Sequence, residues 1–202
     1  RVKPNLPGQF SVYNALAAIS CARLLGVSLA DAAAALETAH GAKGRVEPVP
    51  TDGDYSIFID YAVTPDAIEN VLTTLRGIAP KRLVMLFGAG GDRDRKKRPI
   101  MGKLSADIAD FVIVTSDNPR TEDPMSIIEE ILPGVRAGKA PYKVICDRPE
   151  AIRWAIDHHE PGDVILLCGK GHEDYQIIGH EKIHMDEREI VADYLAERAK
   201  RT

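Results

Sequence analysis

The sequence predicts an α/β fold with a doubly wound, mostly parallel sheet, preceded by a short helical segment. From Arg45 onward, short apolar runs alternate with stretches of helical length. Strands separated by helices of this length usually lie parallel, with helices on both faces of the sheet. Most of the expected helices open with proline, whose missing N–H group costs nothing in the first turn. Before Arg45 the chain is alanine-rich and carries no strand signal.

Residues 8–40 are expected to form a helical hairpin. Apolar side chains recur at helical spacing from Val12 to Leu25. Ser28 and Asp31 then have the spacing of a capping box, which predicts the start of a second helix. These two helices are expected to pack against another part of the protein.

The second helix is expected to end near His40, and the glycine-containing run 41–45 is expected to be a hinge. We therefore divide the chain into domains at residues 1–44 and 45–202. The chain begins Arg-Val-Lys-Pro without an initiator methionine. We expect a linker at this point, and we expect these residues to be a piece of a longer protein.

After the hinge, apolar runs predict the strands and amphipathic stretches predict the helices. The expected strands are 46–49, 55–61, 83–87, 111–115, 143–146 and 164–168. The expected helices are 65–76, 99–108, 124–132, 149–158 and 188–200. A small hairpin is expected over 176–183, beyond the last parallel strand, because Gly179 and His180 provide a turn.

Composition excludes several classes of protein. The 202 residues are 45% hydrophobic and 28% charged, which is typical of a globular chain with one or two cores. The net charge of -4 argues against nucleic acid or a membrane surface as a partner. No apolar run has membrane-spanning length, and no signal peptide is recognisable. The three widely spaced cysteines indicate buried thiols in a reducing compartment, the cytoplasm.

Polar side chains follow four of the expected strands, at the carboxyl end of each. They are Asp60, Arg93, Asp117, Asn118, Arg120 and Glu173. Ligands bind at this edge of an open α/β sheet. Carboxylates, an amide and guanidinium groups offer the acceptors, donors and cations that recognise a zwitterionic amino acid. The sequence therefore predicts a charge-balanced pocket for a small ligand with carboxylate and ammonium groups.

Two glycine-rich loops belong to this edge. Glycines at 88–91 would allow close backbone approach to a ligand, and Asp92 and Asp94 could orient Arg93 between them. Lys96 and Lys97 are expected to be solvated. In the second loop, 169–173, Glu173 would receive an ammonium group.

Several roles stay open on the sequence alone. Lys170 could serve either the fold or a phosphate, and Asp60 could bind a ribose hydroxyl or a cation. Arg45 and Glu47 fit an isolated ion pair as well as an inter-domain ligand contact. The chain contains no nucleophile–base pair and no set of metal-ligating histidines, so no catalytic residue and no metal ligand is predicted in it.

The ordered motifs resemble those of the Mur ligases, the ATP-dependent amide-forming enzymes of peptidoglycan synthesis. The matching runs are 8–15, 44–47, 60–66, 90–94, 117–120 and 169–173. The resemblance covers nearly the whole chain. It implies that 45–202 form the Rossmann-like C-terminal domain that positions the amino acid, and that 1–44 are the helical end of the central ATP-binding domain. The N-terminal and central domains of the same protein would then be its partners.

In this family an Asp-Asn-Pro-Arg loop is associated with members that add meso-diaminopimelate, instead of lysine, to UDP-N-acetylmuramoyl-L-alanyl-D-glutamate, the UDP-MurNAc-dipeptide. Diaminopimelate carries a second carboxylate, with which a guanidinium can pair bidentately. The resemblance implies that this amino acid is held by Arg93, Asp117, Asn118, Pro119, Arg120, Gly169 and Glu173. We expect Arg120 and Asn118 at its distal end.

The implied reaction has two steps. ATP phosphorylates the side-chain carboxylate of D-glutamate to an acyl phosphate, and the amine of diaminopimelate then displaces phosphate. The resemblance implies that Asn14, Arg45 and Asp60 lie near ATP. The P-loop and the Mg²⁺ ligands would lie outside this chain, so these 202 residues alone are expected to have no ligase activity.

Three positions depart from the family pattern: Val63 replaces the usual histidine, Ser11 the usual asparagine and Ala89 a frequent cysteine. The first two weaken the expected nucleotide contacts. One alternative function is another Mur-type or folylpolyglutamate-type ligase with a different amino acid in the pocket. The other is a non-catalytic ligand-binding module, against which the intact loops 117–120 and 169–173 argue.

Overall fold

The computed structural model describes residues 2, 8–39 and 41–201. Its contacts divide the chain into two compact units, Arg1–Ala42 and Lys43–Thr202, close to the boundary predicted between residues 44 and 45. The assignment of the first unit to an ATP-binding domain stays a prediction. His40 and most of the expected N-terminal linker lie outside the described residues.

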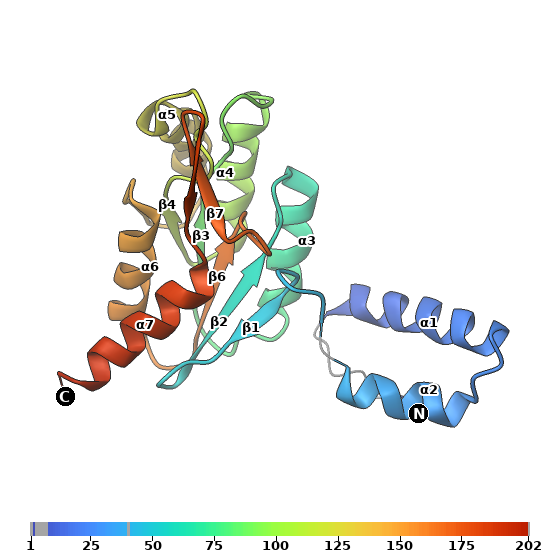
Figure 1. Cartoon of the computed structure of the whole chain (residues 1–202). Coiled ribbons are helices and arrows are strands. Elements are labelled where there is room, and N and C mark those ends of the chain that lie inside the picture. Colours follow the sequence, from blue (N-terminus) through green and yellow to red (C-terminus); the bar gives the residue numbers. More distant parts are fainter. Residues whose placement is uncertain (1, 3–7, 40, 202) are drawn as a thin grey trace. The chain divides into compact units, whose positions relative to one another are not determined.

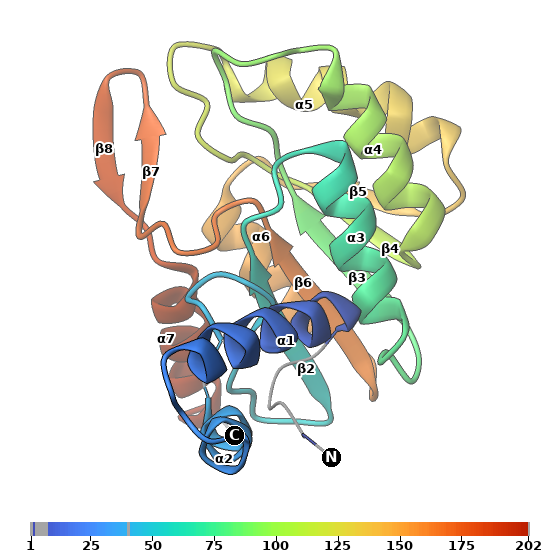
Figure 2. The ribbon, with the colours of Figure 1, turned by 90° about the vertical axis from the view of Figure 1, so that its right-hand side faces the viewer.

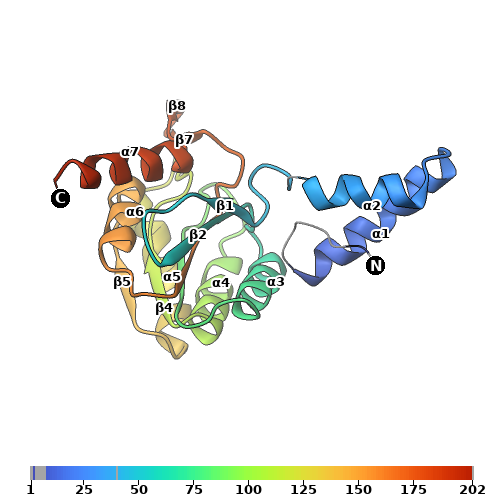
Figure 3. The same cartoon turned by 90° about the horizontal axis from the view of Figure 1, so that it is seen from below.

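The first unit is a pair of helices, α1 (Gln9–Leu24) and α2 (Leu29–Thr38) (Figure 3). The predicted cap at the start of α2 is present, since Ser28 Oγ accepts a hydrogen bond from the Asp31 amide at 3.0 Å. Several apolar side chains of this unit are exposed, among them Leu24 at 88% and Leu25 at 85%. This pattern agrees with the expectation that these helices pack against further protein.

The second unit is a six-stranded sheet in the order β1-β2-β6-β3-β4-β5 (Figure 1). The strands are β1 (Glu47–Val49), β2 (Tyr55–Asp60), β3 (Leu83–Phe87), β4 (Phe111–Val114), β5 (Tyr142–Val144) and β6 (Asp163–Cys168). Neighbouring strands are parallel except β1, which is antiparallel to β2. The predicted doubly wound, mostly parallel α/β fold is confirmed.

Helices cover both faces of this sheet (Figures 1 and 3). They are α3 (Pro65–Arg76), α4 (Lys97–Ile108), α5 (Pro124–Ala137), α6 (Arg148–Asp157) and α7 (Glu187–Ala199). Along β3, Leu83, Met85 and Phe87 face the core formed with α3, α4 and α5. Val84 and Leu86 face the core formed with α6 and α7. A strand that is buried on both faces explains why it is apolar throughout.

Helix α5 extends beyond its predicted end at Leu132 and includes Pro133. Proline usually ends a helix because it has no N–H group and its ring crowds the preceding turn. Beyond Leu132, α5 packs closely on α4 through glycines that leave no room for a side chain. A Cβ added to Gly134 would lie 1.8 Å from the Pro99 carbonyl oxygen, and a Cβ added to Gly102 would lie 2.5 Å from the Ile131 carbonyl oxygen. The two helices approach along glycine, which local propensity does not reveal.

A separate two-stranded hairpin, β7 (Tyr175–Ile178) and β8 (Glu181–His184), follows β6 (Figure 2). It confirms the predicted hairpin and is slightly longer at both ends. Gly179 at its turn has φ 62°, a conformation that favours glycine.

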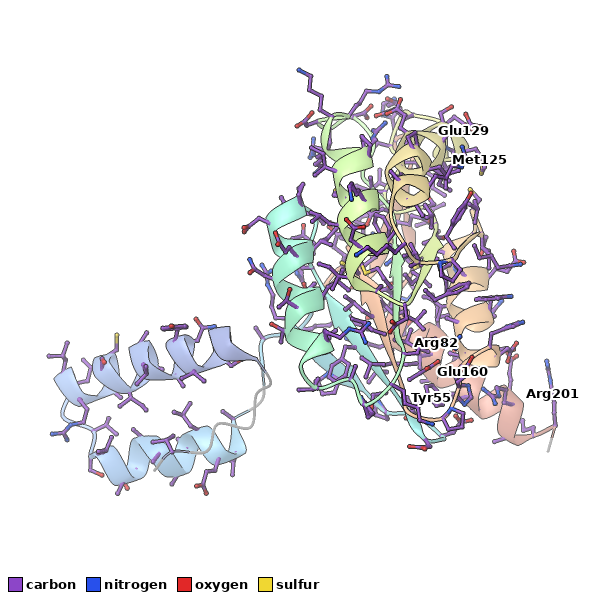
Figure 4. The ribbon with its side chains drawn as sticks, turned by 180° about the vertical axis from the view of Figure 1, so that it is seen from behind. Tyr55, Arg82, Met125, Glu129, Glu160 and Arg201 are labelled. Carbon is purple, nitrogen blue, oxygen red and sulfur yellow. The ribbon has the colours of Figure 1, made fainter. Side chains whose placement is uncertain are left out.

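The charges at the amino-terminal edge of the sheet are paired with one another. Arg82 contacts Asp163 at 2.6 Å and Glu160 at 2.9 Å (Figure 4). Asp163 is 1% exposed, so this guanidinium compensates a buried carboxylate at the start of β6. This edge is therefore held together by its own charges.

At the carboxyl edge, the 1% exposed side chain of Arg148 joins three elements. It contacts Glu187 Oε1 of α7 at 2.8 Å. Its other nitrogens donate to the Ser116 carbonyl at 3.3 Å and the Cys168 carbonyl at 2.8 Å. Arg148 thus ties the chain beyond β4 to the end of β6 and the first turn of α7.

We expect Arg148→Met to lower the free energy of unfolding by about 3–5 kcal/mol, because it leaves the buried Glu187 carboxylate without its partner. Urea unfolding followed by circular dichroism measures the loss. Arg153→Met, on the exposed side of the same helix, is the matched control and should cost less than about 1 kcal/mol. Equal losses in both variants would contradict the role of Arg148.

Candidate functional site

The loops that follow β2, β6, β3 and β4 meet at the carboxyl edge, because these strands are neighbours in the sheet. Backbone hydrogen bonds join them in pairs. The Gly169 amide donates to the Asp60 carbonyl, and the Gly91 amide donates to the Asn118 carbonyl, both at 2.9 Å. The structure therefore brings together the strand-end loops that the sequence singled out.

The centre of this edge is a hydrogen-bonded cluster of Asn118, Lys170 and Glu173. Lys170 Nζ donates to Asn118 Oδ1 and to Glu173 Oε2, both at 2.8 Å. Asn118 Nδ2 donates to the same Glu173 oxygen at 2.9 Å. Lys170 is fully buried and Asn118 is 3% exposed. Of the two roles left open for Lys170, the structure supports the role in the fold.

Glu173 is an ionised carboxylate with one engaged oxygen. Burial raises its pKa, but hydrogen bonds from Lys170 and Asn118 and the charge of Lys170 bring the pKa below the usual range of a glutamate. Its second oxygen, Oε1, accepts a long hydrogen bond of 3.4 Å from the Tyr61 hydroxyl, and Tyr175 also hydrogen-bonds to the carboxylate. This oxygen remains able to accept hydrogen bonds from a cation.

Arg120 stands beside this cluster in a strained backbone conformation, with φ 52°. The hairpin holds it there: its amide donates to the Ile177 carbonyl at 3.0 Å, and its carbonyl accepts from the Gly179 amide at 2.7 Å. Its Nη1 donates to the Gly91 carbonyl at 2.7 Å. Its Nε and Nη2 make no hydrogen bond with the described residues, so one edge of the guanidinium is available to a carboxylate.

Asp117 has one engaged and one free carboxylate oxygen. Oδ1 accepts the Asn118 amide at 2.6 Å, whereas the buried Oδ2 has no hydrogen-bond partner within the described part of the chain. A Cβ on Gly169 would lie 2.6 Å from this Oδ2, and Gly169 has φ 114°. Glycine is therefore required at position 169 for both space and conformation.

Gly88 and Gly91 make room for protein backbone, which corrects the expectation that they allow close approach to a ligand, whereas Gly90 lies next to the Arg120 guanidinium. A Cβ on Gly88 would lie 2.3 Å from the Thr115 carbonyl oxygen, and one on Gly91 would lie 1.8 Å from that of Pro119. The loop after β3 thus packs directly on the loop after β4. Pro119 takes part in the site through this backbone contact.

Arg93 lies on the same loop, close to Gly90, and its side chain is exposed. The expectation that Asp92 and Asp94 orient it is wrong. The Asp92 carboxylate accepts from Thr121 Oγ1 at 2.8 Å, and Asp94 accepts the Lys96 amide at 3.0 Å. Within the described part of the chain, Arg93 donates only to the Asp92 carbonyl, at 3.2 Å.

Lys97 also differs from its expected solvated state. Its Nζ donates to the Val63 carbonyl at 2.8 Å and so joins α4 to the loop before α3. A hydrogen bond to a carbonyl 34 positions away leaves no signal in a run of charged residues.

Arg98 is a further functional residue that the sequence did not reveal. It is fully buried and binds Glu122 with both terminal nitrogens, at 2.7 and 2.8 Å. It also contacts Glu130 at 2.7 Å and the Gly90 carbonyl at 3.2 Å. Glu122 in turn accepts the Asp92 amide at 2.6 Å. This network locks the loop of Arg93 to the segment after Arg120.

The residues expected near a nucleotide do not form a cluster like that of the expected amino-acid site. Both carboxylate oxygens of Asp60 accept backbone amides, from Val46 and Ala62, at 2.8 Å. Burial raises the pKa of Asp60, although these two bonds oppose the rise. Asp60 therefore organises the junction before β1, and its nucleotide contact stays a prediction.

Arg45 lies over the Tyr61 ring, 5.5 Å from its centroid. The ion pair considered for Arg45 and Glu47 does not form, because Glu47 binds Arg188 instead, with Nε donating at 2.8 Å. Asn14 belongs to the first unit, where its side chain is exposed. A nucleotide contact for Arg45 and Asn14 stays a prediction.

The described residues contain neither a metal-binding cluster nor a membrane-spanning helix. No group of three or more His, Cys, Asp and Glu side chains is arranged to hold a metal ion. No helix combines the length and the apolar character needed to cross a bilayer.

Comparison with known proteins gives the family. The model of the Mur ligase, glutamate ligase domain, matches residues 44–171. The chain belongs to the Mur ligase family. The match contains β1 to β6 and the site loops up to Gly171, so the fold is that of a Mur ligase C-terminal domain.

Curated Mur ligases are similar over almost the whole chain. A UDP-N-acetylmuramoyl-L-alanyl-D-glutamate--2,6-diaminopimelate ligase from Caldanaerobacter subterraneus subsp. tengcongensis is 53% identical over 195 residues, which are 96% of this chain and 40% of that protein. A ligase of the same name from Nostoc sp. is 51% identical over 197 residues, which are again 96% of this chain and 40% of that protein. The chain thus spans about 40% of the length of the curated relatives that it matches.

Solved Mur ligase structures share the fold. A UDP-N-acetylmuramoyl-L-alanyl-D-glutamate--2,6-diaminopimelate ligase aligns with TM-score 0.76 and 38% identity, covering 98% of this chain and 40% of that one. UDP-N-acetylmuramate-alanine ligase from Thermotoga maritima aligns with TM-score 0.70 and 25% identity, covering 99% of this chain and 40% of that one.

We expect the contribution of Glu122 to stability to depend on pH. Hydrogen bonds from Arg98 lower the pKa of Glu122 to about 2, although burial opposes this. A carboxyl whose pKa is lowered by folding stabilises the fold above its unfolded pKa and loses that effect as pH falls towards the folded pKa. Glu122→Gln should therefore be less stable than wild type at pH 7, and the difference should shrink between about pH 5 and pH 2.

Thermal unfolding at a series of pH values measures this difference. Glu129→Gln is the matched control, because Glu129 lies exposed on α5 (Figure 4). A difference between Glu122→Gln and wild type that stays constant with pH would show that the Arg98–Glu122 pair does not stabilise the loop.

Proposed function

We propose that this chain is the C-terminal, amino-acid-positioning part of an ATP-dependent ligase. The ligase would add meso-diaminopimelate to UDP-MurNAc-L-Ala-D-Glu during peptidoglycan synthesis in the cytoplasm. The main support is the free edge of the Arg120 guanidinium next to Asn118, whose side chain in turn donates to the Glu173 carboxylate, so that a cation and an anion lie on either side of Asn118. Relatives with 53% and 51% identity carry the name of this activity.

The proposed site matches the chemistry of diaminopimelate, which has a carboxylate and an amine at each end. Arg120, with Nε and Nη2 free, would pair with the distal carboxylate, and Asn118 would add an N–H donor. Glu173 Oε1 and Asp117 Oδ2 would accept hydrogen bonds from amino groups. The exposed Arg93 would reach the second carboxylate. Pro119 and Gly169 complete the site by shaping the two loops.

This part of the ligase would contribute to the reaction by proximity. When bound, ATP supplies the phosphoryl group that converts the D-glutamate side-chain carboxylate into an acyl phosphate. The residues of the amino-acid site would hold the amine of diaminopimelate in line with that carbonyl, so that amide formation releases phosphate. No residue of this chain needs to act as a nucleophile or as a base in this scheme.

The other partners of the reaction would be supplied by the rest of the protein. We expect the N-terminal and central domains to bind the UDP-MurNAc-dipeptide, ATP and Mg²⁺. Asn14, Arg45 and Asp60 would lie beside the nucleotide when the domains close. The second unit offers the exposed Arg45 side chain for this contact, whereas Asp60 would act from a buried position.

Arg120 provides the test of the substrate. In the longer ligase that contains this chain, Arg120→Ala should raise the KM for meso-diaminopimelate about 10- to 100-fold, the loss expected for a charge-assisted pair. Lysine lacks the second carboxylate, so its weaker use as a substrate should change little. Phosphate release with each amino acid measures both values.

Arg153→Ala is the control for this test, because Arg153 is exposed on α6, a helix that carries no residue of the proposed site. An equal loss with diaminopimelate and lysine would contradict the specificity assigned to Arg120. Preference for a different amino acid in the wild type would favour another Mur-type or folylpolyglutamate-type ligase. Absence of any ligase activity in the longer protein would favour a non-catalytic binding module.

The 202 residues alone are expected to form no tripeptide, because the ATP-binding core would lie elsewhere. Incubation with ATP, Mg²⁺, UDP-MurNAc-dipeptide and diaminopimelate, followed by chromatography of the nucleotide products, measures this. The longer ligase is the positive control. Tripeptide formation by the 202-residue chain would refute the expectation.

A further inference from the structure

We propose that Lys170 is a positioning residue of the amino-acid site, which determines the groups that Asn118 and Glu173 present to the ligand without touching the ligand itself. The identity of the ligand rests on the proposed function, whereas the arrangement of these three side chains does not. A lysine between two glycines in a strand-end loop suggests a phosphate contact, but its geometry points to a different role.

Lys170 is enclosed by the protein, and its ammonium group bonds to side chains of the site. Its side chain is fully buried, and its Nζ lies 5.2 Å from the centroid of the Tyr175 ring. The flanking residues Gly169 and Gly171 have φ 114° and 54°, so the backbone takes a path that favours glycine on both sides. A Cβ on Gly171 would also lie 2.5 Å from Tyr61 Cβ. Lys170 therefore acts through its neighbours.

Lys170 first affects the orientation of the Asn118 side-chain amide. Its Oδ1 accepts two hydrogen bonds, from Lys170 Nζ at 2.8 Å and from the Ile177 amide at 2.9 Å. An amide oxygen has two lone pairs, so both are used. Because Lys170 can only donate, the amide is held with its oxygen inward, and Nδ2 faces Glu173 at 2.9 Å. Asn118 can then offer a ligand only an N–H donor, which suits a carboxylate.

Glu173 shows the second consequence. Lys170 and Asn118 both bind its Oε2, which leaves Oε1 as the oxygen available to an ammonium group. With both partners fixed, the site presents a donor and an acceptor side by side. This is the pattern that an amino acid end, with its carboxylate and ammonium groups, requires.

The charge of Lys170 also keeps Glu173 ionised. Burial raises the pKa of Glu173, and Lys170 is the main group that lowers it. Tyr61 from the end of β2 and Tyr175 from β7 also face this carboxylate, and neither carries a positive charge. More distant positive charges are Arg120 near Tyr175, Arg45 over the Tyr61 ring and Lys182 over the Tyr175 ring. Asp117 and His172 also lie near Tyr61.

Removal of Lys170 should therefore raise the pKa of Glu173 above the usual range of a glutamate, because burial is then opposed only by Asn118 and the tyrosines. Carbon-13 NMR titration of the Glu173 carboxyl group, in the 202-residue chain, measures the shift directly. We expect a titration midpoint below the usual range in wild type and one above it in Lys170→Met. Lys103→Met, which removes an exposed lysine of α4 paired with Asp107, should leave the Glu173 midpoint unchanged.

The longer ligase tests the effect on the amino acid. Lys170→Met should raise the KM for meso-diaminopimelate, and this increase should grow as the pH is lowered, while the KM for ATP changes little. A carboxylate with a raised pKa becomes protonated and loses its charge as the pH is lowered, so the loss of affinity should be greater at lower pH. In a Glu173→Gln background the further change Lys170→Met should have much less effect on this KM, because the acceptor on which Lys170 acts is already neutral.

The outcomes are distinct. An unchanged Glu173 midpoint in Lys170→Met, or additive effects of the two substitutions on KM, would overturn the proposal. If Lys170→Met does not fold, Lys170→Gln keeps a hydrogen-bond donor, removes the charge and decides between the same results. If the longer protein does not use diaminopimelate, the proposed function fails, and the NMR titration still tests Lys170.

Discussion

The buried guanidinium of Arg148 is the interaction on which the carboxyl edge of the sheet depends. It holds the carbonyls of Ser116 and Cys168 on one side chain, and the loops that carry the candidate site begin directly after these two residues. A buried arginine is costly to desolvate, so it persists only where its hydrogen bonds and its counter-charge are nearly complete. Here Glu187 supplies the counter-charge from α7. The position of Asp117 relative to Gly169 is therefore set from inside the core.

The buried cations of this molecule are paired with carboxylates, whereas the more accessible cations of the site keep free hydrogen-bond donors. Arg148, Arg98 and Lys170 are fully or almost fully buried, and each neutralises a carboxylate. Arg120 and Arg93 lie nearer the surface and keep free donors. The buried cations hold the loops in place, and the accessible cations remain for recognition, which agrees with the general rule that buried charges are paired.

The fold was predictable because its signals are local. Apolar runs of strand length and proline-opened helices need only neighbouring residues, and their alternation predicts a mostly parallel sheet. The location of the site was predictable for the same reason, since Asn118 and Glu173 follow strands. The roles of Arg98 and Lys97 were not, because burial and partners 24 to 34 positions away decide them. The prediction that the carboxylates next to Arg93 orient it was wrong, because Asp92 and Asp94 bind other groups.

The docking of β7 on the loop 117–120 has a consequence for the order in which the protein acquires its site. Ile177 bonds Asn118 across 59 positions, and Arg120 adopts its left-handed backbone conformation while paired with the hairpin. During synthesis on the ribosome, β4 and its loop emerge long before β7. The loop that would recognise the amino acid therefore reaches its final conformation only after the hairpin has left the exit tunnel.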